Sequence, residues 1–440
     1  MSSFNNHYTI IEYEGFIRDN TTYAGYPYAG YQSLPINTFD ALESFVLANS
    51  SGNESEVTNL LYLSARRGIG KTITARNHVG VITMNDGTVI EILPKICGNN
   101  AGDNKEEQII KTRKIFLEMI RALRDISFKE FQVSNLRTGR LNLLEVFISM
   151  FISEVNTLVK QGLKSTYNTI EGEECFLKGK IDVTQSVRHH PINKEKFYIR
   201  YDEFNLNSPE NRVIKATLRF LVKKSGDARN RMNLTKILTL FENVEFSTDY
   251  ETDFSKCVNN RSASHYAKAL SWCKVFLRGS SFTAFAGSEI AIALLFPMEK
   301  IFESYIAARL RRIIPDGWQM LIQDSKFSLF DRPNIAFRLR PDIILRHEKI
   351  TFVLDTKWKL LSENMQHYGI SQADMYQIYA YSKKYQAEKA VLLYPLPESL
   401  TNKDISYSAD DGVSVCVSLI DLAHTDEHLS ALMSELSLYW

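Results

Sequence analysis

The stretch from Arg340 to Lys357 constrains the fold more strongly than any other part of this 440-residue chain. Two apolar, β-branched runs, Ile343–Leu345 and Ile350–Leu354, flank a short polar segment at residues 347–349. Apolar runs of this length around a polar break predict two antiparallel strands joined by a tight turn. The chain is therefore expected to contain a β-hairpin that carries charged residues at its open end.

The register of this hairpin predicts a cluster of charges. A turn centred between residues 348 and 349 places Asp342 opposite Asp355, and Arg340 opposite Lys357. Because side chains alternate along a strand, Asp355 and Lys357 share a face, which also carries Asp342. Opposed carboxylates repel by up to about 1 kcal/mol unless a cation lies between them. This geometry predicts a Mg²⁺ site in which Lys357 orients or helps to deprotonate an attacking water and stabilises charge on phosphate.

The same residues are also compatible with a surface hairpin that has an ordinary salt bridge from Asp355 to Lys357 or Arg340. A second proline-aspartate pair shows how permissive the spacing is, because Pro315-Asp316 is followed by Asp324 and Lys326. That segment lacks an unbroken apolar strand before Asp324. Sequence context must therefore decide between the two interpretations.

The surrounding context favours a site. Upstream, residues 298–312 have helical periodicity, and Glu303 borders the apolar face, from which it is expected to reach the metal. Downstream, Ser371 caps a predicted helix on which Gln377 and Tyr381 lie one turn apart, either at the site or simply packed on the sheet. A buried strand beginning at Lys389 follows. The predicted order is helix, three antiparallel strands, helix, strand.

This order resembles the core of the PD-(D/E)XK nucleases. The chain also resembles the McrC family, the nuclease subunit of McrBC-type modification-dependent restriction systems. Beyond the hairpin, the resemblance rests on three separated blocks of sequence. They are residues 62–72 with 79–82 and 90–96, residues 162–167 with 171 and 177–181, and residues 201–204 with 211–215.

The resemblance implies a Mg²⁺-dependent endodeoxyribonuclease that is active in complex with an McrB-like AAA+ GTPase. GTP is expected on the partner, and the substrate is expected to be double-stranded DNA with a modified cytosine. Catalytic roles are carried over to Asp342, Asp355 and Lys357, whereas Glu303, Gln377 and Tyr381 are assigned from the broader nuclease pattern. The metal ligands are expected to be Asp342, Asp355 and Glu303. Thr356 occupies a variable position and is expected to have no role.

The overall fold class is expected to be α+β and multidomain. Residues 1–100 are rich in Tyr, Thr, Val and Ile and predict a β-rich domain, which by resemblance engages the partner. Residues 101–282 are expected to be mainly helical. Residues 283–440 are expected to form an α/β PD-(D/E)XK domain, with its start placed near 283–289.

Residues Gly68 to Thr72 resemble the end of a phosphate-binding P-loop. The full motif needs a glycine where this chain has Ala65, and a helix afterwards so that backbone amides face the phosphates. The following residues instead have the pattern of a strand. A hairpin turn is therefore expected here, and no nucleotide site is expected on this chain.

Composition narrows the class of protein. Charged residues make up 23% and apolar residues 44%, and the net charge is only +1, so contact with DNA requires a local basic patch. Candidates for that patch, or for a merely solvated strand face, are Arg338, Arg340, Arg346, Lys357 and Lys359. The five scattered cysteines suggest reduced thiols, and no apolar run approaches the roughly 20 residues of a membrane span. A cytoplasmic protein without a membrane partner is expected.

Two other functions remain open at this level. The chain could act as a non-catalytic assembly factor that stimulates the partner's GTPase and carries a vestigial nuclease domain. It could also be a repair or recombination nuclease that works without a motor. The intact Asp342, Asp355 and Lys357 weigh against the first of these, and the three sequence blocks weigh against the second.

Overall fold

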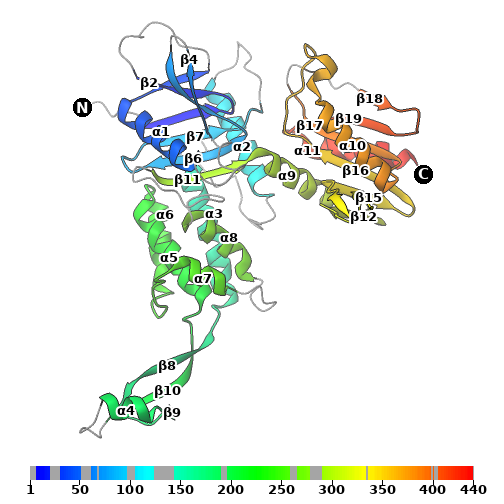
Figure 1. Ribbon diagram of the computed structural model, residues 1–440. Helices are drawn as coiled ribbons and strands as arrows, with labels where there is room; N and C mark the ends of the chain where they lie inside the picture. Colours follow the sequence, from blue (N-terminus) through cyan, green and yellow to red (C-terminus); the bar gives the residue numbers. More distant parts are fainter. Residues whose placement is uncertain are drawn as a thin grey trace. The chain divides into compact units, whose positions relative to one another are not determined.

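The computed structural model of the chain (Figure 1) describes residues 6–19, 30–50, 61–66, 69–96, 105–122, 143–189, 196–257, 265–277, 290–332, 335–397, 400 and 405–439. These residues contain helices and several separate sheets, which confirms a mixed α+β, multidomain chain. The chain divides into two compact units. Unit 1 comprises residues 1–127, 137–140 and 285–440, and unit 2 comprises residues 128–136 and 141–284.

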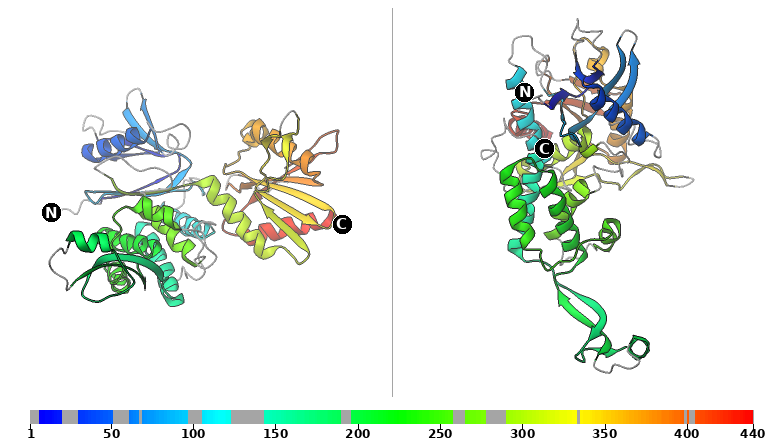
Figure 2. Two further views of the ribbon diagram at one scale, coloured as in Figure 1. Left: turned by 60° about the horizontal axis from the view of Figure 1, so that its bottom comes forward. Right: turned by 90° about the vertical axis from the view of Figure 1, so that its left-hand side faces the viewer.

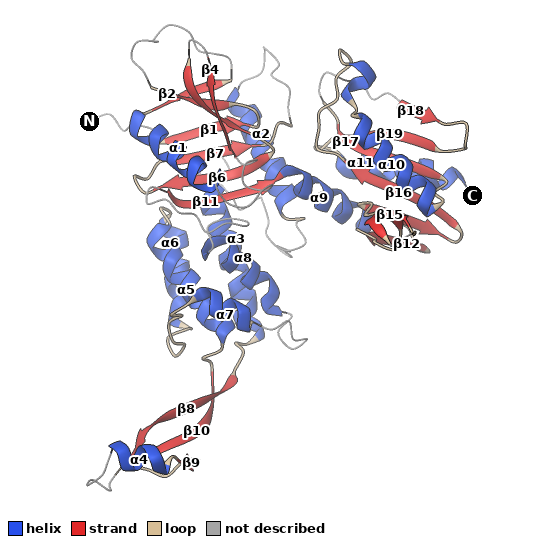
Figure 3. Ribbon diagram, in the orientation of Figure 1, coloured by secondary structure: helices blue, strands red, loops and turns tan. Residues whose placement is uncertain are grey.

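Two four-stranded sheets form the N-terminal part of unit 1 (Figure 3). The first has the order β1-β7-β6-β11, with β1 parallel to β7 and the other pairs antiparallel. The second has the order β3-β2-β5-β4, with β2 parallel to β3, and α1 (Ile36–Ser50) packs on it. The strands are β1 (His7–Ile11), β2 (Gly15–Arg18), β3 (Tyr31–Leu34), β4 (Leu61–Arg66), β5 (Gly70–Ala75), β6 (His78–Met84), β7 (Val89–Leu93) and β11 (Ile290–Pro297).

The segment that resembles a P-loop lies on a β-hairpin. β4 and β5 pair antiparallel, with Arg66 opposite Gly70, and Thr72 lies inside β5. Gly70 has φ +89, a conformation that favours glycine at the end of a turn. The predicted hairpin is confirmed, and the helix that a P-loop requires is replaced by a strand.

β11 joins the N-terminal sheet although it lies far along the sequence. It pairs antiparallel with β6, and Gly80 of β6 has φ +143. A Cβ atom at this position would lie 1.9 Å from the carbonyl oxygen of Leu294, so only glycine allows the two backbones to approach this closely. The region expected to open the nuclease domain therefore contributes a strand to the N-terminal sheet, while residues 283–289 themselves lie outside the described residues. α2 (Lys105–Ile120) also belongs to unit 1, where it contacts β7 and α9 (Met298–Ile313).

A six-stranded mixed sheet forms the C-terminal part of unit 1, in the order β12-β15-β16-β17-β19-β18. β12, β15 and β16 are mutually antiparallel neighbours, whereas β16, β17 and β19 are parallel. Within this sheet the predicted order of helix, three strands, helix and strand is found as α9, β12, β15, β16, α10 and β17, but a separate two-stranded ribbon that was not predicted lies between β12 and β15 in the chain. The elements are β12 (Trp318–Ile322), β15 (Ile343–His347), β16 (Ile350–Thr356), η5 (Gln366–Gly369), α10 (Gln372–Tyr385), β17 (Lys389–Pro395), β18 (Ile405–Ser408), β19 (Ser414–Ile420), α11 (Thr425–Leu436) and η6 (Ser437–Tyr439).

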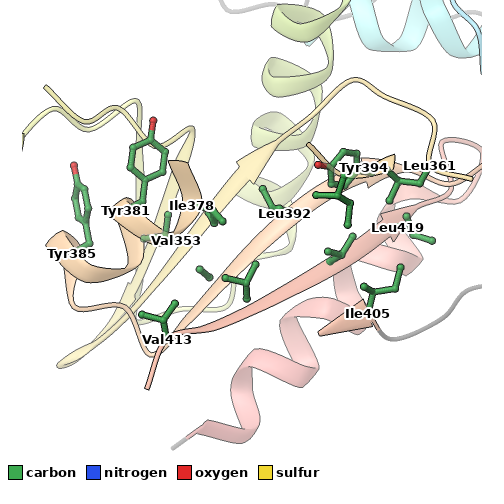
Figure 4. Close-up of a cluster of buried hydrophobic side chains, with 14 of the residues drawn as sticks. Val353, Leu361, Ile378, Tyr381, Tyr385, Leu392, Tyr394, Ile405, Val413 and Leu419 are labelled. Atoms are coloured by element: carbon green, nitrogen blue, oxygen red, sulfur yellow. The ribbon is translucent and has the colours of Figure 1, made fainter. Parts of the chain in front are cut away.

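Helices cover both faces of this sheet, which explains why β17 is buried along its whole length. On one face, Val353 and Leu392 pack with Ile378 and Tyr381 of α10 in the cluster drawn in Figure 4. α9 and α11 contact β16 and β19 and are joined by a hydrogen bond from Tyr305. α10 begins at Ser371, whose hydroxyl accepts the amide of Asp374, so the predicted helix cap is confirmed.

Unit 2 consists of a group of helices and a long β-arm (Figure 2). The arm is a three-stranded sheet in the order β8-β10-β9, with α4 near its end (Figure 1). At the root of the arm, Asn211 is fully buried and donates hydrogen bonds to the backbone carbonyls of Lys164 and Leu206. The elements are α3 (Leu143–Gln161), β8 (Thr166–Glu174), β9 (Lys180–Ile181), α4 (Val183–His189), β10 (Phe197–Asn205), α5 (Pro209–Lys224), α6 (Ala228–Thr239), α7 (Tyr250–Lys256) and α8 (Ala267–Leu277).

Two further observations bear on the sequence predictions. None of the helices in the described ranges is both long and apolar enough to span a lipid bilayer. The four cysteines within those ranges, Cys175, Cys257, Cys273 and Cys416, are free thiols.

Candidate active site

The register of the β15–β16 hairpin brings the predicted carboxylates together. Ile343 pairs with Leu354 and His347 with Ile350, which is the register predicted from the sequence. Continued by one position, it places Asp342 opposite Asp355. Glu348 in the turn has φ +51. The two aspartates therefore lie at the open end of the hairpin, where β15 begins and β16 ends.

The position of Asp355 on the sheet follows from strand alternation. Val353 contacts α10, and Asp355, two positions later, shares that face. Lys357 continues the alternation just beyond the end of β16 and its Nζ donates to Oε1 of Gln377 on α10 at 2.8 Å. The sheet and α10 therefore together place the carboxylates, the lysine and the glutamine in one site.

Burial makes Asp355 an unusual carboxylate. Its side chain is 2% exposed, and burial followed by repulsion from Asp342 raises its pKa to about 6. Burial likewise raises the pKa of Asp342, although two hydrogen bonds from Thr356 oppose the rise. Oδ2 of Asp355 lies 2.7 Å from Nζ of Lys357, an ion-pair contact whose angles do not make a hydrogen bond to that oxygen. A bound cation would relieve the repulsion between these two carboxylates, of which Asp355 is buried and Asp342 half-buried.

Lys357 is held as a cation. Burial lowers its pKa, but Asp355, Asp374 and Asp342 outweigh that effect, so that its pKa is raised overall. Nζ lies 2.7 Å from Asp355 and 3.7 Å from Asp374. The side chain therefore remains an ammonium near neutral pH, which suits stabilisation of negative charge better than abstraction of a proton.

Gln377 and Tyr381 belong to a hydrogen-bonded chain that leads away from Lys357. Nε2 of Gln377 donates to the Tyr381 hydroxyl at 2.8 Å, and that hydroxyl donates to the carbonyl of Arg340 at 3.1 Å. Burial raises the pKa of Tyr381, which keeps its hydroxyl protonated as a donor. The structure thus brings Gln377 to the lysine, and gives Tyr381 a position behind it.

Glu303 does not contact the carboxylate pair directly; Gln323 links it by hydrogen bonds to the backbone of Asp342. Its Oε1 accepts from Nε2 of Gln323 at 2.9 Å, and the backbone amide of Gln323 donates to the carbonyl of Asp342 at 3.0 Å. Within the described part of the chain, no three His, Cys, Asp or Glu side chains are grouped as a metal site. The structure therefore brings together Asp342 and Asp355, but not Glu303, at the predicted metal position.

Two residues of the site were missed by sequence reasoning. Thr356 was expected to have no role, and this is wrong, because its amide and hydroxyl donate to Oδ2 of Asp342 at 2.7 Å and 2.6 Å. Asp374 was not predicted as a site residue, yet its Oδ1 lies 3.7 Å from Nζ of Lys357. The sequence signal for Thr356 was available, because a hydroxyl beside a buried aspartate is a natural hydrogen-bond donor. The proximity of Asp374 to Lys357 depends on the packing of α10 on β16, which local sequence does not reveal.

The donor set fits Mg²⁺. This ion prefers hard oxygen ligands and is commonly held by one or two carboxylates together with water and phosphate oxygens. Asp342 and Asp355 supply two such carboxylates, and Thr356 occupies only Oδ2 of Asp342. The residues present therefore suit a cation that completes its shell from solvent and substrate.

Only part of the predicted basic patch is exposed. Arg338, Arg340 and Lys359 are exposed, whereas Arg346 is half-buried and Lys357 is engaged by the site carboxylates. Lys359 donates to the carbonyl of Gly369.

The site is connected to the N-terminal strands of unit 1 through Trp358, the residue after Lys357. Its indole Nε1 donates to Oε2 of Glu12 at 3.0 Å, and its ring packs against Phe302 of α9. Oε2 of Glu12 also accepts the amide of Lys95 at 2.9 Å. Burial outweighs these hydrogen bonds and raises the pKa of Glu12 to about 7. A buried carboxylate from the first strand region thus supports the end of β16.

Comparison with known proteins agrees with the resemblance seen in the sequence. The family model described as McrBC 5-methylcytosine restriction system component matches residues 73–395. A type IV methyl-directed restriction enzyme of Escherichia coli K12, EcoKMcrBC, is 23% identical over 315 residues, which cover 66% of this chain and 87% of that protein. A chain in the refined half-complex from the tetradecameric assembly of Thermococcus gammatolerans McrB AAA+ hexamers with bound McrC shares the fold, with a TM-score of 0.65 at 19% identity, over 98% of this chain and 100% of that one. The chain belongs to the McrBC 5-methylcytosine restriction system component family, and the family assignment made from its sequence is confirmed.

Proposed function

We propose that this chain is the Mg²⁺-dependent DNA endonuclease subunit of a GTP-dependent, modified-cytosine-directed restriction complex. The observation that carries the proposal is the convergence of Asp342, Asp355 and Lys357 at the end of one hairpin. The surrounding α9, β12, β15, β16, α10 and β17 follow the order of the PD-(D/E)XK nuclease core. Membership of the restriction family supports DNA as the substrate.

The partner is proposed to be an McrB-like AAA+ GTPase, which binds and hydrolyses GTP. The structural relative whose fold this chain shares comes from an assembly of McrB AAA+ hexamers with bound McrC. The P-loop-like segment of this chain lies on a β-hairpin, so the nucleotide is assigned to the partner.

The residues of the site have separable tasks in phosphodiester hydrolysis. A bound Mg²⁺ would polarise the phosphate and lower the pKa of its water. Asp342 and Asp355 would hold the ion, and Thr356 fixes Asp342 through two hydrogen bonds. Lys357, held by Gln377, stabilises the negative charge that develops on the phosphate oxygens.

The outer residues position these groups. Gln377 and Tyr381 fix the direction of the ammonium through their hydrogen-bonded chain to Arg340. Glu303, linked through Gln323 to the backbone of Asp342, is proposed to join the metal shell through a water or after a small rotation.

A non-catalytic assembly factor is the second candidate. The structure supports catalysis, because a buried and a half-buried carboxylate with raised pKa values destabilise the folded state. If cleavage were no longer selected, Asp342 or Asp355 would be expected to be replaced by a neutral residue that makes the folded state more stable. A motor-independent repair nuclease is disfavoured by the extent of the family match, residues 73–395.

The test is cleavage of methylated and unmethylated plasmid by the full chain, with and without its candidate GTPase and GTP, in Mg²⁺ or EDTA. Asp355→Ala and Asp342→Asn are compared with Asp316→Asn. Asp316 is an exposed aspartate that also follows a proline, so it controls for the loss of one charge in the same sequence context.

The proposal expects cleavage that requires methylated DNA, Mg²⁺, the partner and GTP, and that is lost in the two site variants but kept in Asp316→Asn. Partner GTPase stimulation that survives in Asp355→Ala would show that the variant still assembles. If the wild-type chain stimulates the GTPase but cleaves no DNA under any condition, the assembly-factor function is correct instead.

A further inference from the structure

A small two-stranded ribbon beside the candidate site exposes large apolar side chains. β13 (Ser328–Phe330) and β14 (Ala336–Arg338) pair antiparallel, with Phe330 opposite Ala336. Phe330 is 55% exposed, Phe337 73% and Ile335 73%. We call β13 and β14, together with Ile335 and the flanking Arg332 and Arg340, the β13–β14 ribbon.

These exposed side chains are not explained by the ribbon's own packing. Phe330 and Phe337 make an edge-to-face contact with ring centroids 6.0 Å apart, yet both remain largely in solvent. Phe337 has φ +56, an uncommon backbone conformation for a bulky residue that costs about 1 kcal/mol or more. Exposed apolar groups gathered in one place mark interaction surfaces. The ribbon therefore presents its aromatic residues at some cost and without an internal partner that covers them.

The charge around these rings is positive. Arg332, Arg338 and Arg340 are exposed, and none of their guanidinium groups forms an ion pair with another described residue. The one acidic residue of the segment, Asp331, is engaged by Lys384 of α10 at 3.0 Å. The ribbon thus combines free arginines with exposed rings, a combination that complements a polyanion with an apolar interior.

The β13–β14 ribbon is linked to the candidate site by hydrogen bonds and side-chain packing. Leu339, buried directly after β14, donates its amide to the carbonyl of Phe327, whose ring packs edge-to-face on Tyr385 of α10. The backbone carbonyl of the next residue, Arg340, accepts a hydrogen bond from the Tyr381 hydroxyl, and Asp342 lies two positions later in the chain. The same helix, α10, therefore braces the ribbon and holds Lys357 through Gln377.

We propose that the β13–β14 ribbon is a DNA-binding element that contacts the duplex next to the cleaved phosphodiester, with its arginines on phosphates and its phenylalanines against the sugar and base edges. This inference rests on the proposed nuclease function and names the surface by which the substrate is held. Apolar wedges flanked by arginine are a known means of gripping the minor groove or an unstacked step. Protein interfaces are also enriched in aromatic residues and arginine, so it is the link from the ribbon to the candidate site through α10 that favours DNA as its ligand.

Site-specific photocrosslinking tests the contact directly. A benzophenone side chain replaces Phe337 in the full chain, in complex with the partner and methylated duplex, in EDTA so that cleavage plays no part. Leu438 of η6, an exposed apolar residue in the same unit, is the matched control position. The inference expects a crosslink to DNA from position 337 and none from position 438.

Other outcomes separate this inference from the proposed function. The ribbon's role is overturned if the variant with benzophenone at position 337 crosslinks only to the GTPase subunit, or crosslinks to nothing, while the wild-type chain cleaves DNA. The nuclease proposal is then left intact. Failure of the wild-type chain to cleave in Mg²⁺ overturns the nuclease proposal, whatever position 337 contacts.

The size of the ribbon's contribution to DNA affinity is measured by titrating a short labelled duplex with the full chain in EDTA and monitoring fluorescence anisotropy. Phe337→Ser is expected to weaken binding by roughly 5- to 100-fold, the range for loss of one aromatic contact to a base. Arg338→Gln should reduce the salt dependence of log K by about one unit of slope, because one phosphate contact is lost. Leu438→Ser should change neither quantity, and equal affinities for Phe337→Ser and the wild-type chain would contradict the proposal.

Discussion

Two antiparallel strand pairs of this chain, the β15–β16 hairpin and the β8–β10 pair of the arm, have the same backbone pairing but opposite exposure to solvent. β15–β16 lies inside a six-stranded sheet, where Ile343, Ile344, Leu354 and Asp355 are all buried. β8–β10 pairs over nine residues on each strand but stands in solvent along most of its length. Both carry charged and hydroxyl side chains. Only in the first hairpin are these groups removed from water.

This difference decides what a charge does. In the arm, Arg200 and Glu171 lie 3.3 Å apart and are both well exposed, so water screens their attraction. In the site hairpin, burial raises the pKa of Asp355 and makes its repulsion from Asp342 consequential. The same residue types therefore form a solvent-screened ion pair on the β-arm and a buried carboxylate with a raised pKa in the site hairpin.

The largest expected effect is on catalysis. Asp355→Ala should lower the rate of DNA cleavage by at least about a thousandfold, since loss of the proposed metal ligand would remove several kcal/mol of transition-state stabilisation. The same change should leave the free energy of unfolding unchanged or higher, because it removes a buried charge and its repulsion from Asp342. Cleavage assays and urea denaturation measure the two quantities. A marked loss of stability would mean that Asp355 is mainly structural.

The next effect concerns a buried carboxylate that supports the site hairpin. Glu12 has a pKa of about 7, above its ordinary value of 4.5, so the folded state binds its proton more tightly than the unfolded state. The stability from this proton is therefore present below about pH 4.5 and lost as the pH rises to about 7, a decline of about 3 kcal/mol. Glu12→Gln should remove this component of the pH dependence. Denaturation of both proteins across this range measures it, and parallel curves would contradict the prediction.

A smaller effect comes from one hydroxyl in each hairpin. Thr356 donates to Asp342 at 2.6 Å in the buried site, and Thr169 donates to Asp202 at 2.7 Å in the exposed arm. Thr356→Val should cost about 1–2 kcal/mol of unfolding free energy and reduce cleavage, because a buried charge loses a donor. Thr169→Val should cost only a few tenths of a kcal/mol, since water replaces the donor. Equal costs would break the comparison between the hairpins.

The smallest effect is expected for the exposed ion pair of the arm. Arg200→Gln should change the free energy of unfolding by less than about 0.5 kcal/mol, and the change should vanish at high salt. Thermal denaturation at low and high ionic strength measures it. A cost above about 1 kcal/mol that persists in salt would show that the arm is packed more tightly than its exposure indicates.

Much of the site was accessible from local pattern. The apolar runs around residues 347–349 predicted both strands and their register, and Ser371 predicted the start of α10. Gln377 was identified as a candidate from the nuclease pattern that the sequence resembles, one helical turn from Tyr381 on the same predicted helix. Glu303 was placed on the correct helix, but the sequence did not reveal that Gln323 stands between it and Asp342.

Domain boundaries were less accessible. β11 has the composition of any buried strand, and its pairing with β6 depends on Gly80, more than 200 residues earlier. Such a pairing leaves no periodic signal near either strand, so the sequence placed residues 290–297 in the C-terminal domain, whereas β11 pairs with β6. The β-arm in the middle region was missed for a related reason, because its exposed strands lack the clean apolar alternation by which half-buried strands are recognised.

By itself, the sequence determined the elements whose signals are local: the site hairpin with its two aspartates and lysine, the capped helix after it, and the family to which the chain belongs. Only the tertiary structure decided how deeply those charges are buried, which side chain holds Lys357, and why Thr356 matters. The reason is physical. Strand and helix patterns arise from neighbouring residues, whereas pKa values and hydrogen-bond partners depend on the desolvation and contacts that distant segments impose when they pack together.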